Sequence, residues 1–172
     1  MFGHADNNQF DMQVSMDYFE ELVKAEVANG TPMRRIVFMG DSQGAGMVVL
    51  FLQTREIASE LGAVISYAGF PATDLKSVQQ MQMDSNLHGS WAKETRLFML
   101  HGRDDVFVPI EISQSWLKLL EEECERGEGF RSIDWKLIDD VRHSLSGRVW
   151  PYVREILESI FQDETQKPPL KL

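Results

Sequence analysis

The hydrophobic residues of the chain fall into two patterns that alternate along it. Short apolar runs, the last of them alternating with polar positions, predict four buried β-strands at residues 35–39, 63–67, 96–100 and 133–138. Apolar residues at helical spacing predict helices at residues 12–27, 45–61, 111–126 and 149–160. Because strands and helices alternate, we expect an α/β protein in which helices flank a parallel sheet of about four strands.

The remaining stretches carry weaker signals. Residues 1–11 are polar and predict a loose lead-in, while residues 72–95 show little strand signal and allow a short helix. The tail at 163–172, which contains lysines and paired prolines, is expected to be disordered. Because there are no internal repeats and no linker, we expect residues 1–172 to form a single domain.

A five-residue motif lies between the first predicted strand and the helix that follows it. Gly40-Asp41-Ser42-Gln43-Gly44 has the G-x-S-x-G pattern of a nucleophile elbow, a sharp turn that lifts a serine hydroxyl out of the sheet. The two flanking glycines are expected to let strand and helix pack closely without Cβ clashes. The alternative is that the serine only caps the N-terminus of a buried helix.

Two more polar loops follow predicted strands, one with Asp104 and Asp105 and one with His143. The carboxyl ends of parallel strands open on the same edge of a sheet, so these loops can converge with the serine turn. A serine nucleophile needs a neighbouring base, and the base needs a carboxylate to orient it. We therefore predict that Ser42, Asp105 and His143 are catalytic, with the backbone N–H of Gln43 as an oxyanion donor.

Other interpretations of these loops remain open at this point. Asp104 competes with Asp105 for the acid role, and His143 is alternatively a loop histidine bonded to Asp139 or Asp140. A metal site is a further possibility, with six loop residues as ligands: His101, Asp104, Asp105, Asp139, Asp140 and His143. Their spacing fits no recognised metal motif and leaves the serine turn unexplained. We predict that His101, which closes a strand, is structural.

Composition narrows the range of partners. The net charge of −10 argues against binding to nucleic acid or to an anionic membrane surface, both of which favour basic patches. The single cysteine, Cys124, cannot form an internal disulfide and is expected to lie on a buried helix face. No signal peptide and no apolar run long enough to span a membrane is found, so we expect a cytoplasmic protein without stable membrane insertion.

Four segments carry a family resemblance. They read RRIVFMGDSQGAG, AVISYAGFP, LFMLHGRDDVFVP and DVRHS, and together they resemble the acyl-protein thioesterase / carboxylesterase family of α/β-hydrolases. The resemblance implies a cytosolic serine hydrolase that needs no metal or organic cofactor. Its substrates would be acylated proteins, lysophospholipids or small esters. Carried over by position, Ser42 matches the nucleophile, Asp105 the acid and His143 the base.

The chain also departs from the family pattern. The family has several strands before its elbow strand, and a loop among them supplies the second oxyanion N–H. Here one helix precedes the elbow, so we expect the C-terminal part of the fold, with its elbow strand as an exposed edge open to self-association. Asp41 stands where the family usually has a bulky apolar residue, and Ala45 replaces a frequent glycine. A catalytically impaired remnant that acts as a binding module, or a longer gene product, are the alternative interpretations.

Overall fold

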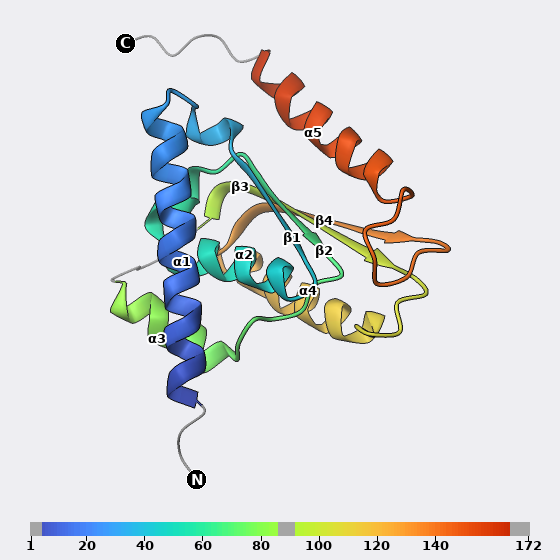
Figure 1. The fold of residues 1–172 in the computed structure, drawn as a ribbon, viewed down its shortest axis with the longest axis horizontal. Coiled ribbons are helices and arrows are strands. Elements are labelled where there is room, and N and C mark those ends of the chain that lie inside the picture. Colours follow the sequence, from blue (N-terminus) through green and yellow to red (C-terminus); the bar gives the residue numbers. More distant parts are fainter. Residues whose placement is uncertain (1–4, 86–91, 166–172) are drawn as a thin grey trace.

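The predicted parallel sheet forms the centre of the molecule (Figure 1). The computed structural model describes residues 5–85 and 92–165. The four strands are β1 Val37–Asp41, β2 Ala63–Tyr67, β3 Ala92–Gly102 and β4 Phe130–Ile138. They lie in chain order and each neighbouring pair is parallel. All four strands therefore end on the same edge, which confirms the expectation on which the predicted site depends.

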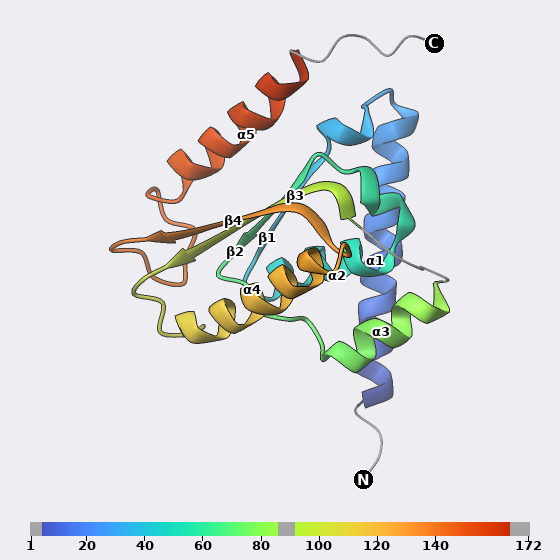
Figure 2. The same ribbon diagram turned by 180° about the vertical axis from the view of Figure 1, so that it is seen from behind.

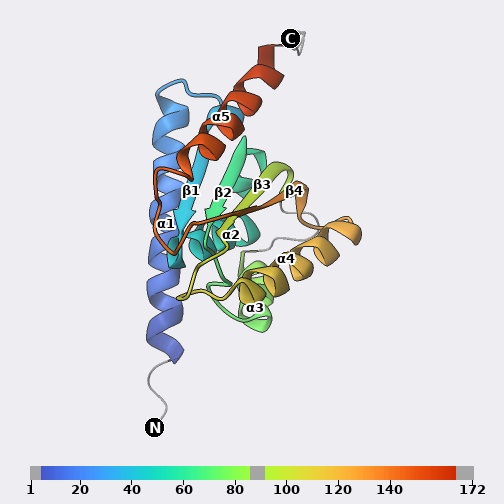
Figure 3. The same cartoon turned by 90° about the vertical axis from the view of Figure 1, so that its right-hand side faces the viewer.

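Helices cover the two faces of the sheet unequally (Figures 2 and 3). One side carries α1 Ala5–Ala28, α2 Gln43–Thr54, α3 Leu75–Asp84 and α4 Ile110–Glu125. Among the described helices, α5 Trp150–Thr165 is the one that packs on the other side. Two short 3₁₀ helices, η1 Met33–Arg35 and η2 Glu56–Glu60, precede β1 and β2. Of the helices in the described ranges, none combines the length and apolar character needed to cross a membrane.

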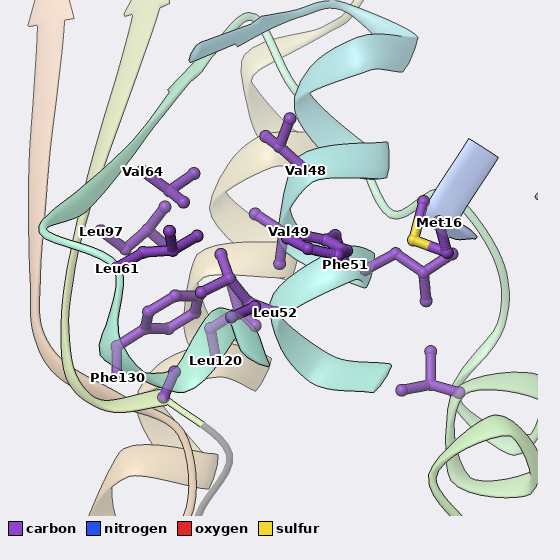
Figure 4. Packing of buried hydrophobic residues seen from close by; sticks show 14 of the residues in the cluster. Met16, Val48, Val49, Phe51, Leu52, Leu61, Val64, Leu97, Leu120 and Phe130 are labelled. Atoms are coloured by element: carbon purple, nitrogen blue, oxygen red, sulfur yellow. The ribbon is translucent and has the colours of Figure 1, made fainter. Parts of the chain in front are cut away.

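The strand β2 divides the hydrophobic core into two parts. Val64 packs with Phe51 and Leu97 in the larger cluster, which lies between the sheet and helices α1, α2 and α4 (Figure 4). Ile65 and Tyr67 belong to the smaller cluster beneath α5. All five residues of β2 are buried, so its sequence is a continuous apolar run rather than an alternating one.

Three helix boundaries differ from the prediction. α1 begins at Ala5, within the expected lead-in. The helix after the elbow ends at Thr54, because Arg55 is extended and binds Asp17 of α1 at 2.6 Å, and η2 replaces the last predicted turns. α5 continues to Thr165, so the first part of the predicted tail is helical, and residues 166–172 lie outside the described residues.

The start of β3 also differs from the prediction. The strand begins at Ala92 rather than at residue 96, with an irregular register before Arg96. Lys93 and Glu94 are exposed and interrupt the apolar pattern. Thr95 is buried and its hydroxyl donates to the Leu61 carbonyl oxygen at 3.1 Å. A polar side chain with a buried partner therefore looks the same in the sequence as a solvated one.

β1 is an edge strand, as expected. Within the described residues it pairs with β2 alone. Ile36 and Ser42 direct their peptide groups to the β2 side, so those of Val37 and Met39 face the open side. Both side chains are apolar, whereas β4, at the other edge, carries arginine, aspartate and lysine. Charges protect a strand edge from pairing, and along Val37 and Met39 that protection is missing.

An apolar groove of about 780 Å³ runs along one flank of α5. Trp150, Pro151, Leu157 and Phe161 contribute to its walls. The inner side of the same helix packs on the sheet through the smaller core cluster. Val153 and Leu157 belong to both the groove and this cluster, so the groove borders the core-facing side of α5.

Candidate active site

Ser42 lies in a strained turn between β1 and α2. Its φ of 54° and ψ of −120° are rarely adopted by L-residues. A Cβ at Gly40 would lie 2.3 Å from the Gly44 carbonyl oxygen, so glycine is required there. The prediction for Gly44 itself is wrong, because a Cβ there would meet nothing within 4 Å. Gly46 has the second packing role, since its Cβ would lie 2.3 Å from the Phe70 carbonyl oxygen.

The structure brings the side chains of Ser42, Asp105 and His143 together. Nε2 of His143 lies 2.9 Å from Oγ of Ser42, and Nδ1 of His143 lies 2.8 Å from Oδ2 of Asp105. With its proton on Nδ1, the imidazole donates to the carboxylate and accepts from the serine hydroxyl. Ser42 makes no side-chain capping hydrogen bond to α2, so the interpretation of Ser42 as a simple helix cap is wrong.

The alternative partners of His143 are engaged elsewhere. Asp139 accepts a hydrogen bond from Arg103 at 2.5 Å, and Asp140 accepts one from Arg148 at 2.8 Å. These ion pairs lie at the surface, and the ring of His143 contacts Asp105 and Ser42 instead. The alternative in which His143 is a loop histidine bonded to either aspartate is therefore wrong.

Asp105, rather than Asp104, supplies the carboxylate. Its Oδ1 accepts the backbone N–H groups of Phe107 and Val108, both at 2.9 Å, which leaves Oδ2 for His143. Burial raises the pKa of Asp105, but the hydrogen bonds from Val108, His143 and Phe107 outweigh it, so the pKa lies below its ordinary value. The carboxylate is therefore charged at neutral pH and can stabilise an imidazolium.

His101 is structural, as predicted, and supports the loop that carries the acid. It is fully buried, and its Nε2 donates at 3.0 Å to the carbonyl oxygen of Val108, whose own N–H binds Asp105. Nδ1 of His101 lies 3.1 Å from Oγ of Ser113, and the Ser113 hydroxyl donates to the Gly69 carbonyl oxygen at 2.5 Å. Burial lowers the pKa of His101, against the opposing effects of Val108 and Asp105.

The arrangement does not favour the metal-site interpretation. In the part of the chain that the structure describes, no group of three or more His, Cys, Asp or Glu side chains is placed to hold a metal ion. Five of the six side chains grouped in that interpretation have other partners: Asp139 and Asp140 are in ion pairs, His101 is in its buried network, and Asp105 and His143 contact each other.

Two features beside Ser42 affect negative charge that develops there. Gln43 is the first residue of α2, where backbone N–H groups have no intrahelical acceptor and the helix dipole favours an anion. Asp41 is exposed at the end of β1, and its charge would oppose an oxyanion. Partial desolvation raises the pKa of Asp41 above its ordinary value, with His143 opposing the shift and Asp105 reinforcing it.

The structure also shows neighbours of the site that the sequence did not reveal. Val106 and Phe107 are each 78% exposed, and the Phe107 ring lies 5.5 Å from the His143 ring. Two large apolar residues together in a loop were the available signal. Tyr67, on β2, contacts the loop of His143, and a tyrosine in a strand gives no sign of such a contact.

Comparisons with known proteins assign the chain to a family. The family model described as Phospholipase/Carboxylesterase matches residues 2–159. The chain belongs to the phospholipase/carboxylesterase family. The family that the sequence predicted is thereby confirmed.

Relatives within the phospholipase/carboxylesterase family include fungal acyl-protein thioesterases. Acyl-protein thioesterase 1 of Gibberella zeae is 28% identical over 133 residues, which are 77% of this chain and 51% of the relative. Acyl-protein thioesterase 1 of Cryptococcus neoformans var. neoformans is 30% identical over 123 residues, which are 69% of this chain and 48% of the relative. The chain spans about half the length of the curated relatives it matches.

Solved structures confirm the α/β-hydrolase fold. The crystal structure of Arabidopsis thaliana SOBER1 matches with a TM-score of 0.69 at 20% identity, over 87% of this chain and 64% of that one. The Bacillus cereus carboxylesterase matches with a TM-score of 0.62 at 16% identity, over 88% of this chain and 62% of that one. At this identity the likeness concerns the fold alone.

Proposed function

We propose that the chain hydrolyses acyl thioesters or carboxylic esters through an acyl-enzyme intermediate on Ser42. The observation that carries this proposal is the continuous hydrogen-bonded series from Ser42 through His143 to Asp105 at a strained elbow. Membership in the phospholipase/carboxylesterase family supports the same chemistry. Neither step of the mechanism uses a metal or an organic cofactor.

The first half of the reaction is acyl transfer to the enzyme. Nε2 of His143 accepts the hydroxyl proton as Oγ of Ser42 attacks the acyl carbonyl carbon. The resulting oxyanion accepts the N–H of Gln43, and Asp105 stabilises the imidazolium. When the tetrahedral intermediate collapses, His143 returns the proton to the departing thiol or alcohol.

The second half releases the acid. Water takes the place of the leaving group, and His143 accepts its proton as the water oxygen attacks the acyl-serine carbonyl. Collapse of this intermediate breaks the bond to Oγ of Ser42, which regains the proton from His143. The products are a carboxylic acid and the free serine.

The oxyanion site limits the expected rate. Gln43 is the one donor that we assign, and the described residues before β1 form helices rather than a strand–loop unit that would bring a second. Loss of one oxyanion donor typically costs about 100- to 1,000-fold in rate. We therefore expect the triad chemistry at a reduced rate from this chain.

The substrate class follows from the relatives' names, which describe acyl-protein thioesterases. We propose acylated proteins, lysophospholipids or small esters as substrates of a cytoplasmic enzyme. The exposed pair Val106 and Phe107 beside His143 supports a substrate with an apolar acyl group.

A fluorophosphonate probe tests the proposed nucleophile directly, because it forms a stable adduct only with an activated serine. The purified chain is labelled and its intact mass measured, beside Ser42→Ala, His143→Ala and a control, Ser15→Ala, in which a partly exposed α1 serine is lost. We expect one adduct on the wild type and the control and none on the two site variants. A wild-type chain with a folded circular dichroism spectrum and no adduct would contradict the proposal.

A second candidate function rests on the edge of β1. In this alternative, the chain is an impaired hydrolase that binds another polypeptide, such as a second copy, through the open side of β1. The apolar and unprotected positions Val37 and Met39 favour it. Stable association of a folded chain that fails to react with the probe would support this function over hydrolysis.

A further inference from the structure

Tyr67 makes contacts with two parts of the candidate site. Its backbone carbonyl oxygen accepts the N–H of Ser42 at 2.9 Å, next to the strained turn. Its hydroxyl donates to the carbonyl oxygen of Arg142 at 2.6 Å and lies 3.1 Å from that of Ser144. Arg142 and Ser144 are the residues on either side of His143. One buried residue therefore holds the nucleophile through its backbone and the base through its side chain.

The loop of His143 depends on such contacts because it has little regular structure. It connects the end of β4 to the start of α5 and contains Asp140, whose φ of 55° is unusual for a non-glycine residue. Val141 is buried, and its carbonyl oxygen accepts the N–H of Asp104 at 3.0 Å. This contact lies before His143, whereas the Tyr67 hydroxyl reaches both sides of it.

The hydroxyl of Tyr67 reaches two carbonyl groups by sharing its hydrogen between them in a three-centre bond, with the shorter contact to Arg142. A phenol has one hydrogen to donate, and a carbonyl oxygen can only accept. Burial, with smaller contributions from Asp105 and Asp41, raises the pKa of Tyr67 to about 12. The phenol therefore keeps its hydrogen throughout the pH range in which a serine hydrolase works.

We infer that Tyr67 is a positioning residue whose hydroxyl fixes the His143 loop, so that Nε2 stays on Ser42 and Nδ1 on Asp105. This inference rests on the proposed function for its catalytic consequence and on the hydrogen bonds alone for its structural one. Tyr67→Phe removes the hydroxyl and retains the backbone contact to Ser42. The variant therefore removes a hydrogen bond to the loop of the base, His143, and leaves the turn of the nucleophile, Ser42, in place.

The expected kinetic effect follows from the role of orientation in catalysis. A displacement of about 1 Å in a catalytic group can cost about 100-fold in rate. We expect Tyr67→Phe to lower kcat by roughly 10- to 100-fold while KM changes little, because the loop position and not substrate contact is altered. Tyr18→Phe, which removes a hydroxyl from an α1 residue that is 61% exposed, is the matched control and should not change either constant.

Proton NMR of the His143 ring gives a readout that is independent of turnover. The Nδ1 proton that binds Asp105 is assigned by its absence from His143→Ala. We expect a low-field signal in the wild type and in Tyr18→Phe, and at least fivefold faster exchange with water in Tyr67→Phe, with a thermal melt to confirm that each variant is folded. Exchange within twofold of the wild type, or a wild type without this signal, would overturn the inference, as would an unchanged kcat.

The two proposals fail separately in this design. A wild-type chain that shows the Nδ1 signal but forms no fluorophosphonate adduct contradicts the proposed hydrolysis and leaves the positioning role to be decided by the exchange rate. If Tyr67→Phe does not fold, 3-fluorotyrosine is incorporated into the double variant Tyr18→Phe/Tyr152→Phe. Of the three tyrosines of the chain, this variant retains only Tyr67. The stronger phenol donor is expected to slow the Nδ1 exchange, and an unchanged rate would overturn the inference.

Discussion

Two histidines close to each other in the structure have different surroundings at the residue scale. His143 lies between Ser42 and Asp105 with about a quarter of its side chain exposed, which allows it to exchange protons with a substrate. His101 is fully buried with its Nε2 on the Val108 carbonyl oxygen. Burial disfavours the charged form of this ring, so His101 is expected to affect stability rather than proton transfer.

The lowered pKa of His101 predicts a pH dependence of stability. Below the ordinary pKa of 6.5, the unfolded chain takes up a proton at this ring that the folded chain resists. The stability contribution is therefore complete above pH 6.5 and is lost as the pH falls toward the folded-state pKa. We expect the free energy of unfolding of the wild type to fall between pH 7 and 5, by at most about 1.4 kcal/mol per pH unit from this group. His101→Gln should show a shallower slope.

Urea unfolding at several pH values measures this slope. Because both chains retain His143 and Asp105, the difference between wild type and His101→Gln isolates the buried ring. Parallel curves for the two chains would show that His101 is not held neutral by its surroundings.

The residues of the site differ in how far the sequence could reveal them. Ser42, Asp105 and His143 follow strands in a fixed order, so a local pattern was sufficient to predict that they meet. The contacts of Tyr67 join positions more than 70 residues apart and depend on backbone carbonyl groups, which leave no pattern in the side-chain sequence. The catalytic roles of Ser42, Asp105 and His143 are predictions that the labelling experiment tests.

At the element scale, the junction of β1 and α2 is determined by a glycine contact that can be tested. A Cβ at Gly40 would lie 2.3 Å from a backbone oxygen, whereas one at Gly44 would meet nothing within 4 Å. We expect Gly40→Ala to displace the start of α2, to reduce the fluorophosphonate labelling rate by at least 10-fold and to lower the melting temperature. Gly44→Ala should label at a rate within about threefold of the wild type, because the added methyl group has no close contact. Alanine is also the better helix former, so α2 should not be weakened.

The pair of variants is its own control, since the two substitutions add the same methyl group to the same motif. Equal labelling rates would mean that the elbow adapts to a side chain at residue 40. If Gly44→Ala alone lost labelling, the close contact would be at Gly44 and not at Gly40.

The bounds of an element could be predicted where the element is buried on both faces. The strand β2 is buried on both faces and its predicted bounds agree with the structure. The start of β3 was missed because Lys93 and Glu94 are exposed there, and the end of α2 because Arg55 leaves the helix for an ion pair with Asp17. Tertiary contacts of single polar residues decide such boundaries, and the local apolar pattern does not contain them.

At the scale of the whole molecule, the open side of β1 predicts self-association. The N–H of Met39 faces away from β2, so proline at this position blocks a new pairing without removing a hydrogen bond of the existing sheet. We expect the wild type to form dimers that depend on concentration in sedimentation velocity. Met39→Pro should be monomeric at the same concentrations.

Met39→Ala separates the backbone effect from the side chain. It removes the apolar side chain that packs toward α5 but keeps the N–H, and it should still dimerise. A monomeric wild type would rule out pairing of two copies along β1, and a monomeric Met39→Ala would assign association to the side chain instead.

The one-sided packing of α5 has a consequence for how the molecule loses activity on heating. Elements with few buried neighbours open as separate cooperative units before the rest of a domain unfolds. The loop with His143 leads directly into α5, which contacts the sheet on its inner side only. When α5 detaches, that loop gains slack at one end while the four strands remain paired. We therefore expect thermal inactivation to begin at the C-terminal helix, so that activity is lost at a lower temperature than the one at which the sheet melts.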